Sequence, residues 1–160
     1  MSRYQFEVRS LLEGCDIAEV WQQIGTWSGV NHEIGPILSM PAPEQYEDLA
    51  SIPADGKSHF SLTIYLFGFL PFDRHRFAFE SVDAPHGFHE RSSNLQTSRW
   101  VHKRSLRQTP NGVEVFDECS FVPRIAFLGP IIRAIFLRVF QRRHRRLQAV
   151  FAKSGLVPVQ

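Results

Sequence analysis

The last third of the chain predicts one long amphipathic α-helix, which restricts how the rest of the sequence can fold. Between Pro130 and Ser154, apolar residues recur at spacings of three and four and so fall on one helical stripe. They are Ile132, Ile135, Phe136, Val139, Phe140, Leu147, Val150 and Phe151. Pro130 suits a first turn, and Gly155 is typical of the position after a helix. Such an aromatic stripe needs a concave apolar partner.

Alternating apolar and polar residues upstream predict an antiparallel sheet as that partner. A first strand surrounds Phe6, and a capping box of Asp16 and Glu19 begins a short helix. A second short helix is expected over about residues 26–33. Residues 36–56 contain several prolines and read as an irregular surface excursion that covers an opening of the domain.

From residue 57 onward the pattern is that of β-strands. Residues 60–66 and 74–81 alternate around a turn at 68–71, which predicts two antiparallel strands. Residues 88–93 form a short polar strand, expected at a sheet edge or in a wet cavity wall. The Asn-Gly pair in segment 110–113 favours a two-residue type I′ hairpin turn.

That turn predicts the register of the last hairpin and places Arg104 opposite Cys119, with Asp117 diagonal to Arg104. His102, Arg104 and Asp117 share one face with apolar residues, while the other face carries a ladder of opposite charges. The first face is therefore predicted to point inward. Because a buried charge is costly unless it is paired, these three residues need an explanation.

Three interpretations of this inward face remain open. Arg104 and Asp117 form a structural ion pair capped by His102, or the three residues are the polar floor of an apolar cavity. Such a floor would bind the oxygen or carboxylate end of a small hydrophobic ligand. The third interpretation is catalysis by His102, oriented by Asp117. His144 lies beside the helix stripe and raises the same question, as does His75; both read more simply as boundary residues.

Charge is distributed unevenly along the chain. Residues 1–50 carry eight acidic and two basic side chains, whereas residues 123–160 carry eight basic side chains and no acidic one. The two ends can neutralise each other by packing side by side, or the basic helix can meet an anionic membrane surface. The membrane contact would use Arg142, Arg143, Arg145 and Arg146. We expect no nucleic-acid partner, because interleaved stacking aromatics are missing.

Length and composition predict a single domain over residues 1–160. The first residues show no apolar run of the signal-peptide type, and no apolar stretch is long enough to span a bilayer, so we expect a soluble cytoplasmic protein. Cys15 and Cys119 read as free or buried thiols. No metal site and no cofactor are expected, and nothing indicates an oligomeric state.

Taken together, these segments resemble the START-like, polyketide-cyclase-type superfamily, known as SRPBCC or the helix-grip fold. The segments that carry the resemblance are the strand at Phe6, Ala18–Trp21, Leu66–Phe72, Trp100–Arg104, Asp117, Pro123–Arg124 and Phe140–Leu147. The resemblance implies an α+β fold in which a curved antiparallel sheet of six or seven strands wraps around a long C-terminal helix, with two short helices after strand 1. It also implies a deep apolar cavity, used in the superfamily for lipids, sterols, polyketides or hydrophobic hormones.

We therefore expect a protein that binds a small hydrophobic ligand between its sheet and its C-terminal helix. The expected apolar lining is Leu62, Ile64, Phe77, Phe79, Trp100, Phe121, Phe136 and Phe140. The expected polar contacts are His102, Arg104, Asp117 and His144. Two alternatives remain: a cyclase or dehydratase that uses His102, and a peripheral lipid-transfer protein that docks through its basic helix.

Overall fold

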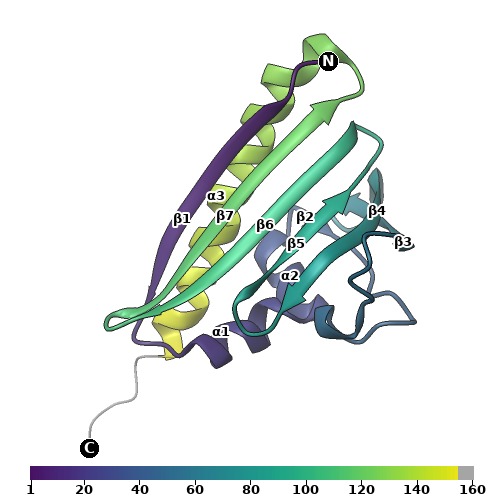
Figure 1. The fold of residues 1–160 in the computed structure, drawn as a ribbon. Helices are drawn as coiled ribbons and strands as arrows, with labels where there is room; N and C mark the ends of the chain where they lie inside the picture. Colours follow the sequence, from purple (N-terminus) through teal and green to yellow (C-terminus); the bar gives the residue numbers. More distant parts are fainter. Residues whose placement is uncertain (155–160) are drawn as a thin grey trace, which may run out of the picture.

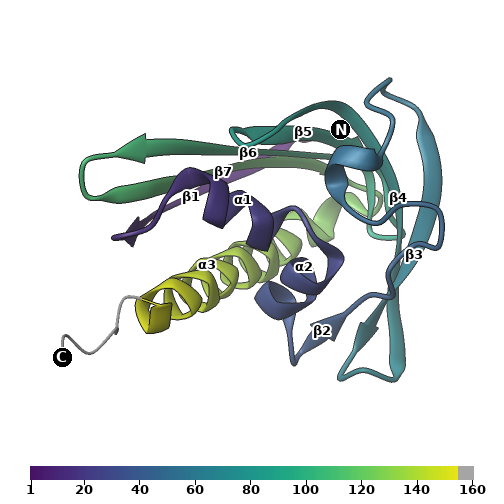
Figure 2. The same ribbon diagram turned by 90° about the horizontal axis from the view of Figure 1, so that it is seen from below.

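The C-terminal helix lies on the concave side of one curved antiparallel sheet (Figures 1 and 2). The computed structural model describes residues 1–154. The seven strands follow the order β1-β7-β6-β5-β4-β3-β2, and each neighbouring pair is antiparallel. The predicted α+β helix-grip architecture is confirmed, with the larger of the two expected strand counts.

The elements follow the order that the sequence patterns predicted, with β2 and two 3-10 helices in addition. The strands are β1 (Tyr4–Glu13), β2 (Leu38–Ser39), β3 (Ser58–Leu66), β4 (Leu70–Asp83), β5 (Gly87–Ser92), β6 (Thr97–Thr109) and β7 (Gly112–Pro123). The α-helices are α1 (Ile17–Ile24), α2 (Trp27–Ile34) and α3 (Gly129–Ser154), and the 3-10 helices are η1 (Leu49–Ser51) and η2 (Ala126–Leu128).

Helix α3 buries most of its predicted stripe against the sheet. Phe140 and Leu147 are buried, and His144 occupies the stripe position between them. Ile135 of the predicted stripe is 47% exposed and lines the cavity between the sheet and the helix instead of being packed in the core. The predicted stop at Gly155 lies outside the described residues.

The two short helices begin as their capping residues indicated. The Asp16 carboxylate accepts a hydrogen bond from the Ala18 amide at 2.8 Å, and the Asp16 amide donates to Glu19 Oε2 at 3.2 Å. Helix α2 starts after Thr26, whose hydroxyl oxygen accepts from the Gly29 amide at 3.0 Å. These caps satisfy amide groups that have no partner within the first turn. Figure 2 shows both helices beside α3 under the sheet.

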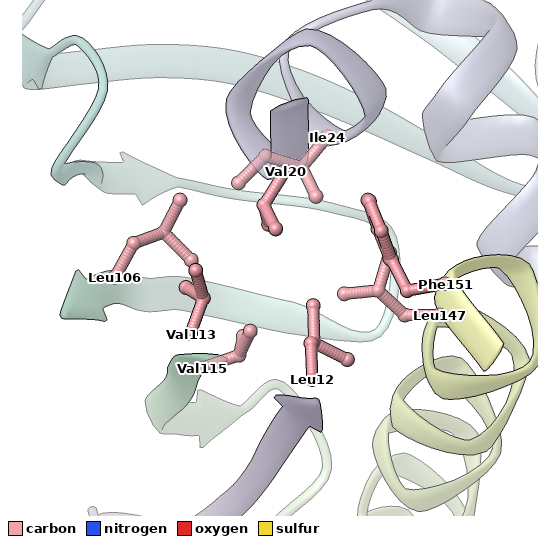
Figure 3. Close-up of a cluster of buried hydrophobic side chains, with 8 residues drawn as sticks. All are labelled: Leu12, Val20, Ile24, Leu106, Val113, Val115, Leu147 and Phe151. Atoms are coloured by element: carbon pink, nitrogen blue, oxygen red, sulfur yellow. The ribbon is translucent and has the colours of Figure 1, made fainter. Parts of the chain in front are cut away.

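The C-terminal half of α3 is anchored by a cluster of eight buried apolar side chains that point toward one another (Figure 3). They come from β1, α1, β6, β7 and α3, and they are Leu12, Val20, Ile24, Leu106, Val113, Val115, Leu147 and Phe151. Full burial of a side chain of this size contributes about 1.5–3 kcal/mol. The cluster therefore holds the helix against the sheet at the end remote from its first turn.

Residues 36–56 are less irregular than expected. Leu38 of β2 pairs with Leu66 of β3, and η1 follows ten residues later. Leu49 and Ile52 are buried in a second apolar cluster with Trp27 and Phe77. The prolines interrupt regular structure here, but the apolar residues between them still reach the core.

The register of the last hairpin differs by two residues from the prediction. Thr109 pairs with Gly112, so Pro110 and Asn111 form the turn. Proline fixes φ near −65°, which suits the first central position of a turn and excludes the positive φ of type I′. Gly112 is needed for another reason: its φ is 141°, and a Cβ there would lie 2.0 Å from the Leu12 carbonyl oxygen on β1.

The register change leaves the faces of the two strands as predicted, because side chains in a strand alternate with a period of two. His102, Arg104 and Asp117 all point inward and are buried. Arg104 lies directly opposite Asp117 instead of diagonal to it.

The strand at residues 88–93 was predicted to lie either at a sheet edge or in a wet cavity wall. The edge position is wrong, because β5 pairs with β4 on one side and with β6 on the other.

The apolar cluster generates a test of how α3 is held. We expect Leu147→Ala to lower the free energy of unfolding by about 2–5 kcal/mol, because it leaves a cavity among fully buried neighbours. Urea unfolding measures this as a lower midpoint with an unchanged m-value. The control is Arg145→Ala on the exposed face of α3, which should change stability by less than about 0.5 kcal/mol. Similar losses in both variants would contradict the anchoring role of the cluster.

Candidate functional site

The site is built around the guanidinium group of Arg104, which is only 2% exposed. Asp117, the directly opposite residue on β7, receives two hydrogen bonds from it, at 2.8 Å from Nε and 2.7 Å from Nη2. Glu33, at the end of α2, receives two more from Nη1, at 2.9 and 3.0 Å. Arg104 therefore joins the sheet to a helix that follows β1 in the sequence.

Glu33 also binds the C-terminal helix. Arg143 Nε donates to Glu33 Oε2 at 3.0 Å, and the Arg143 guanidinium carbon lies 4.8 Å from the centroid of the Phe140 ring. Glu33 has no exposed surface. It was not among the site residues expected from the sequence. Glu33 lies three residues after Val30, which places it on the inner face of α2. This spacing was the sequence feature that could have predicted its burial.

Histidines extend this arrangement in two directions. The Nε2 atom of His144 lies 2.8 Å from Asp117 Oδ2, and the Nε2 atom of His102 lies 2.7 Å from Asp117 Oδ1. The second nitrogen of His144 lies 2.6 Å from the Ser10 hydroxyl on β1. On the other side, Glu90 Oε2 lies 3.7 Å from His102 Nδ1.

Glu90 is in turn 2.5 Å from His75 Nε2, so the chain of contacts reaches β4. We call the eight linked residues the buried ionic cluster. They are Glu33, His75, Glu90, His102, Arg104, Asp117, Arg143 and His144. No fully buried side-chain nitrogen or oxygen in the described part of the chain lacks a hydrogen-bond partner.

The carboxylates of the cluster are held in their ionised form. Burial alone would raise the pKa of Asp117, but the charges of Arg104 and His102 outweigh burial and hold that pKa well below its ordinary value. Burial likewise opposes ionisation of Glu33, and Arg104 with Arg143 lowers its pKa. The pKa of Glu90 is lowered as well, because His75 and His102 outweigh the effect of burial. The cluster thus combines three carboxylates with two guanidinium groups and three histidines.

One end of the cluster opens into a cavity of about 140 Å³ between the sheet and α3. Its apolar lining comes mainly from α2, β2, β3, β4 and α3, and six polar side chains also line it. The apolar residues are Ile34, Leu38, Met40, Ile64, Phe72, Phe77, Trp100, Ile135, Phe136, Val139 and Phe140. The polar residues are Asp73, His75, Glu90, Asn94, His102 and Arg143. Phe72 and Ile135 are also partly exposed, so the cavity reaches the surface beside them.

The structure divides the twelve site residues expected from the sequence into three groups. Those that line the cavity are Ile64, Phe77, Trp100, His102, Phe136 and Phe140. Arg104, Asp117 and His144 lie in the buried ionic cluster without lining the cavity. Leu62, Phe79 and Phe121 pack inside apolar clusters. Sequence reasoning missed Asp73, Glu90, Asn94 and Arg143 as lining residues and treated His75 as a boundary residue.

The four clustered arginines of α3 do not all face outward. Arg143 binds Glu33, and Arg146 Nε donates to the His32 carbonyl oxygen at 2.6 Å. Arg145 is exposed and Arg142 is partly exposed. The acidic N-terminal segment and the basic helix therefore do meet, through Glu33.

Three further properties of residues 1–154 bear on metal binding, thiol chemistry and membrane spanning. This part of the chain has no group of His, Cys, Asp and Glu side chains arranged to hold a metal ion. Cys15 and Cys119 are free thiols, and burial raises the pKa of the Cys119 thiol. None of the helices described is long and apolar enough to cross a membrane.

A curved seven-stranded sheet gripping a C-terminal helix, with a cavity between them, is the helix-grip fold that the sequence resemblance implied. The chain belongs to the family described as Domain of unknown function (DUF8410), which matches residues 14–151. A comparison with curated proteins found no match.

Solved structures share the fold at low sequence identity. A protein from Chromobacterium violaceum aligns with a TM-score of 0.72 and 9% identity over 92% of this chain and 96% of its own. A START superfamily protein from Mycobacterium smegmatis gives 0.65 and 7% over 96% of this chain and 99% of its own. The di-domain ARO/CYC protein StfQ of the steffimycin biosynthetic pathway gives 0.68 and 9% over 97% of this chain and 52% of its own. At these identities the likeness concerns the fold alone.

The buried ionic cluster generates a stability test. We expect Glu33→Gln to lower the free energy of unfolding by about 3–5 kcal/mol, because it leaves Arg104 and Arg143 with one carboxylate fewer in a buried site. Chemical denaturation at neutral pH measures this loss. Glu44→Gln, at an exposed position, is the matched control and should be nearly neutral. A Glu33→Gln variant as stable as the control would show that the ion pairs with α2 carry little weight.

The lowered carboxyl pKa values also predict how stability depends on pH. Glu33, Glu90 and Asp117 bind protons less readily in the folded than in the unfolded chain. Their stabilising contribution is present above the unfolded pKa of about 4 and is lost as pH falls toward the folded values. Each group contributes up to about 1.4 kcal/mol per pH unit in that window. Urea unfolding between about pH 6 and pH 3 should show this loss, and a constant stability would contradict it.

Proposed function

We propose that the chain binds a small hydrophobic molecule in the cavity between its sheet and α3. The observation that carries this proposal is a mainly apolar cavity, lined by aromatic and aliphatic side chains together with several polar ones. Ligand sites have this composition, because apolar contact supplies the affinity and a few polar groups orient the ligand. The open mouth beside Phe72 and Ile135 supports access from outside.

The size of the cavity limits what fits entirely inside it. About 140 Å³ is close to the volume of a cavity that accommodates a benzene molecule, roughly 150 Å³. A ligand with one aromatic ring therefore matches this conformation. A sterol, a lipid or a polyketide of several rings would have to extend through the mouth, with one end inside.

The aromatic lining favours a ring as the buried part of the ligand. Phe77 of β4, Trp100 of β6, and Phe136 and Phe140 of α3 surround the space from two sides. The rings of Trp100 and Phe136 already meet edge to face, with centroids 5.1 Å apart. Aromatic side chains attract a further ring in offset or edge-to-face geometry, which adds to the effect of apolar burial.

The environment of His102 favours binding over acid–base catalysis by that residue. Its Nε2 lies 2.7 Å from Asp117 and its Nδ1 lies 3.7 Å from Glu90. A general acid or base must reach a proton of the substrate, directly or through one water. Both nitrogens of His102 are directed at carboxylates, so His102 serves the cluster more directly than it serves a ligand.

The arginines of α3 give weaker support to docking on a membrane. Arg143 and Arg146 make contacts inside the molecule, which leaves Arg142 and Arg145 of the four for an anionic surface. Attraction to such a surface grows with the number of nearby basic side chains. Ligand binding in the cavity therefore accounts for more of the structure than membrane binding through this segment.

A cavity-filling variant tests the proposal. Val139 of α3 lines the cavity, so the side chain of Val139→Trp should occupy the ligand space. We expect toluene to bind the wild-type protein with a dissociation constant on the order of 1 mM or tighter, and the variant at least about tenfold more weakly. Isothermal titration calorimetry gives both affinities. Val122→Trp, on the outward face of β7, is the control and should bind toluene as the wild type does. Equal binding by Val139→Trp would place the ligand elsewhere.

A further inference from the structure

Two polar side chains of the cavity carry atoms that have no hydrogen-bond partner among residues 1–154. Asp73 of β4 is 5% exposed and Asn94, in the β5–β6 connection, is 6% exposed, and both line the cavity. Neither belongs to the buried ionic cluster. Polar side chains this deeply buried normally have all their hydrogen-bonding atoms paired, so the partnerless atoms need an explanation.

Only one of the two carboxylate oxygens of Asp73 forms hydrogen bonds with the described residues. Asp73 Oδ1 accepts hydrogen bonds from the Arg74 amide at 2.8 Å and from the Leu95 amide at 2.9 Å. No described residue donates to Oδ2. The Leu95 bond also brings Asp73 next to the segment that contains Asn94.

The orientation of the Asn94 amide follows from its three donors. Asn94 Oδ1 accepts from the Gln96 amide at 3.0 Å, from the Thr97 amide at 2.7 Å and from the Thr97 hydroxyl at 3.0 Å. Only the oxygen of the side-chain amide can accept from three donors. The NH₂ group therefore points away from them, and no described residue accepts a hydrogen bond from it.

Each of the two free atoms keeps some accessible surface. Every fully enclosed side-chain nitrogen or oxygen of the described residues has a partner, so the free atoms of Asp73 and Asn94 must adjoin open space. The open space that the two residues share is the cavity. The cavity therefore offers a hydrogen-bond acceptor on Asp73 and a donor on Asn94, and the hydrogen bond from the Leu95 amide to Asp73 Oδ1 holds the two segments together.

We propose that Asp73 and Asn94 form a subsite for a hydroxyl group, and that the ligand is a small hydroxylated aromatic molecule of the phenol class. This inference rests on the proposed function and names the ligand chemistry. A hydroxyl group donates one hydrogen bond and accepts others through a single oxygen. It would donate to Asp73 Oδ2 and accept from Asn94 Nδ2 while its ring lies among the aromatic side chains.

Charged groups fit this subsite less well. A carboxylate would be repelled by the carboxylate of Asp73, and an ammonium group could pair with Asp73 but could not accept a hydrogen bond from Asn94 Nδ2. An apolar ligand that covered these two atoms would remove them from water without giving them partners, which is costly. A neutral group with one donor and one acceptor function satisfies both atoms.

The test compares 4-methylphenol with toluene, which differ by one hydroxyl group. Calorimetric titration of the wild-type protein should show 4-methylphenol binding roughly 10- to 100-fold more tightly, as expected for a hydrogen bond to a charged group. In Asp73→Asn this advantage should fall at least about tenfold, while toluene affinity changes less than about twofold. The variant keeps Oδ1 for the two backbone amides and replaces Oδ2 with a donor.

Asp83→Asn is the matched control, since Asp83 is exposed and lies on the same strand; it should leave both affinities unchanged. Equal wild-type affinities for the two ligands would overturn the hydroxyl subsite and leave the proposed function standing. Equal losses of both ligands in Asp73→Asn would also overturn it. Failure of both ligands to bind the wild-type protein would reject the proposed function together with the subsite. The wild-type comparison does not depend on how the variant folds.

Discussion

The pairing of the buried Arg104 guanidinium is the interaction on which the rest of the structure depends. A charge removed from water is tolerated only when several well-placed partners replace its hydration. Asp117 supplies one partner from the neighbouring strand, and Glu33 supplies the other from α2. Arg143 and His144 of α3 bind the same two carboxylates. The sheet and two helices therefore meet at one electrostatic centre, which restricts how they can be placed.

The cavity lies where this centre meets the aromatic part of α3. Apolar packing fills the space around Leu147, whereas near Phe140 the helix face borders open volume. Glu90 and His75, two members of the buried ionic cluster, contact each other and also line the cavity. The same residues thus neutralise buried charge and give an apolar cavity a polar part of its lining. The Glu90 carboxylate and the His75 ring are already paired with each other within the protein. Polar recognition of a ligand is therefore left to cavity atoms that have no partner among the described residues, such as those of Asp73 and Asn94.

Prediction from the sequence succeeded where the pattern itself holds the information. Strand alternation assigned His102, Arg104 and Asp117 to the inner face, and this survived an error of two residues in register. The error arose because Asn-Gly was weighed above the preceding Pro110, whose fixed φ decides the turn. Glu33 was missed because one acidic residue at the end of an amphipathic helix looks like an ordinary polar cap.

The sequence by itself determined the order of elements, the inward faces of the strands and the buried face of α3, because these depend on local periodicity and capping. It could not determine that Glu33 meets Arg104, or that Asp73 lies beside Asn94, since these pairs are 71 and 21 positions apart. Only the tertiary structure decided them. The curvature of the sheet sets which distant side chains meet, and the balance of filled and open volume under α3 sets where a ligand can enter.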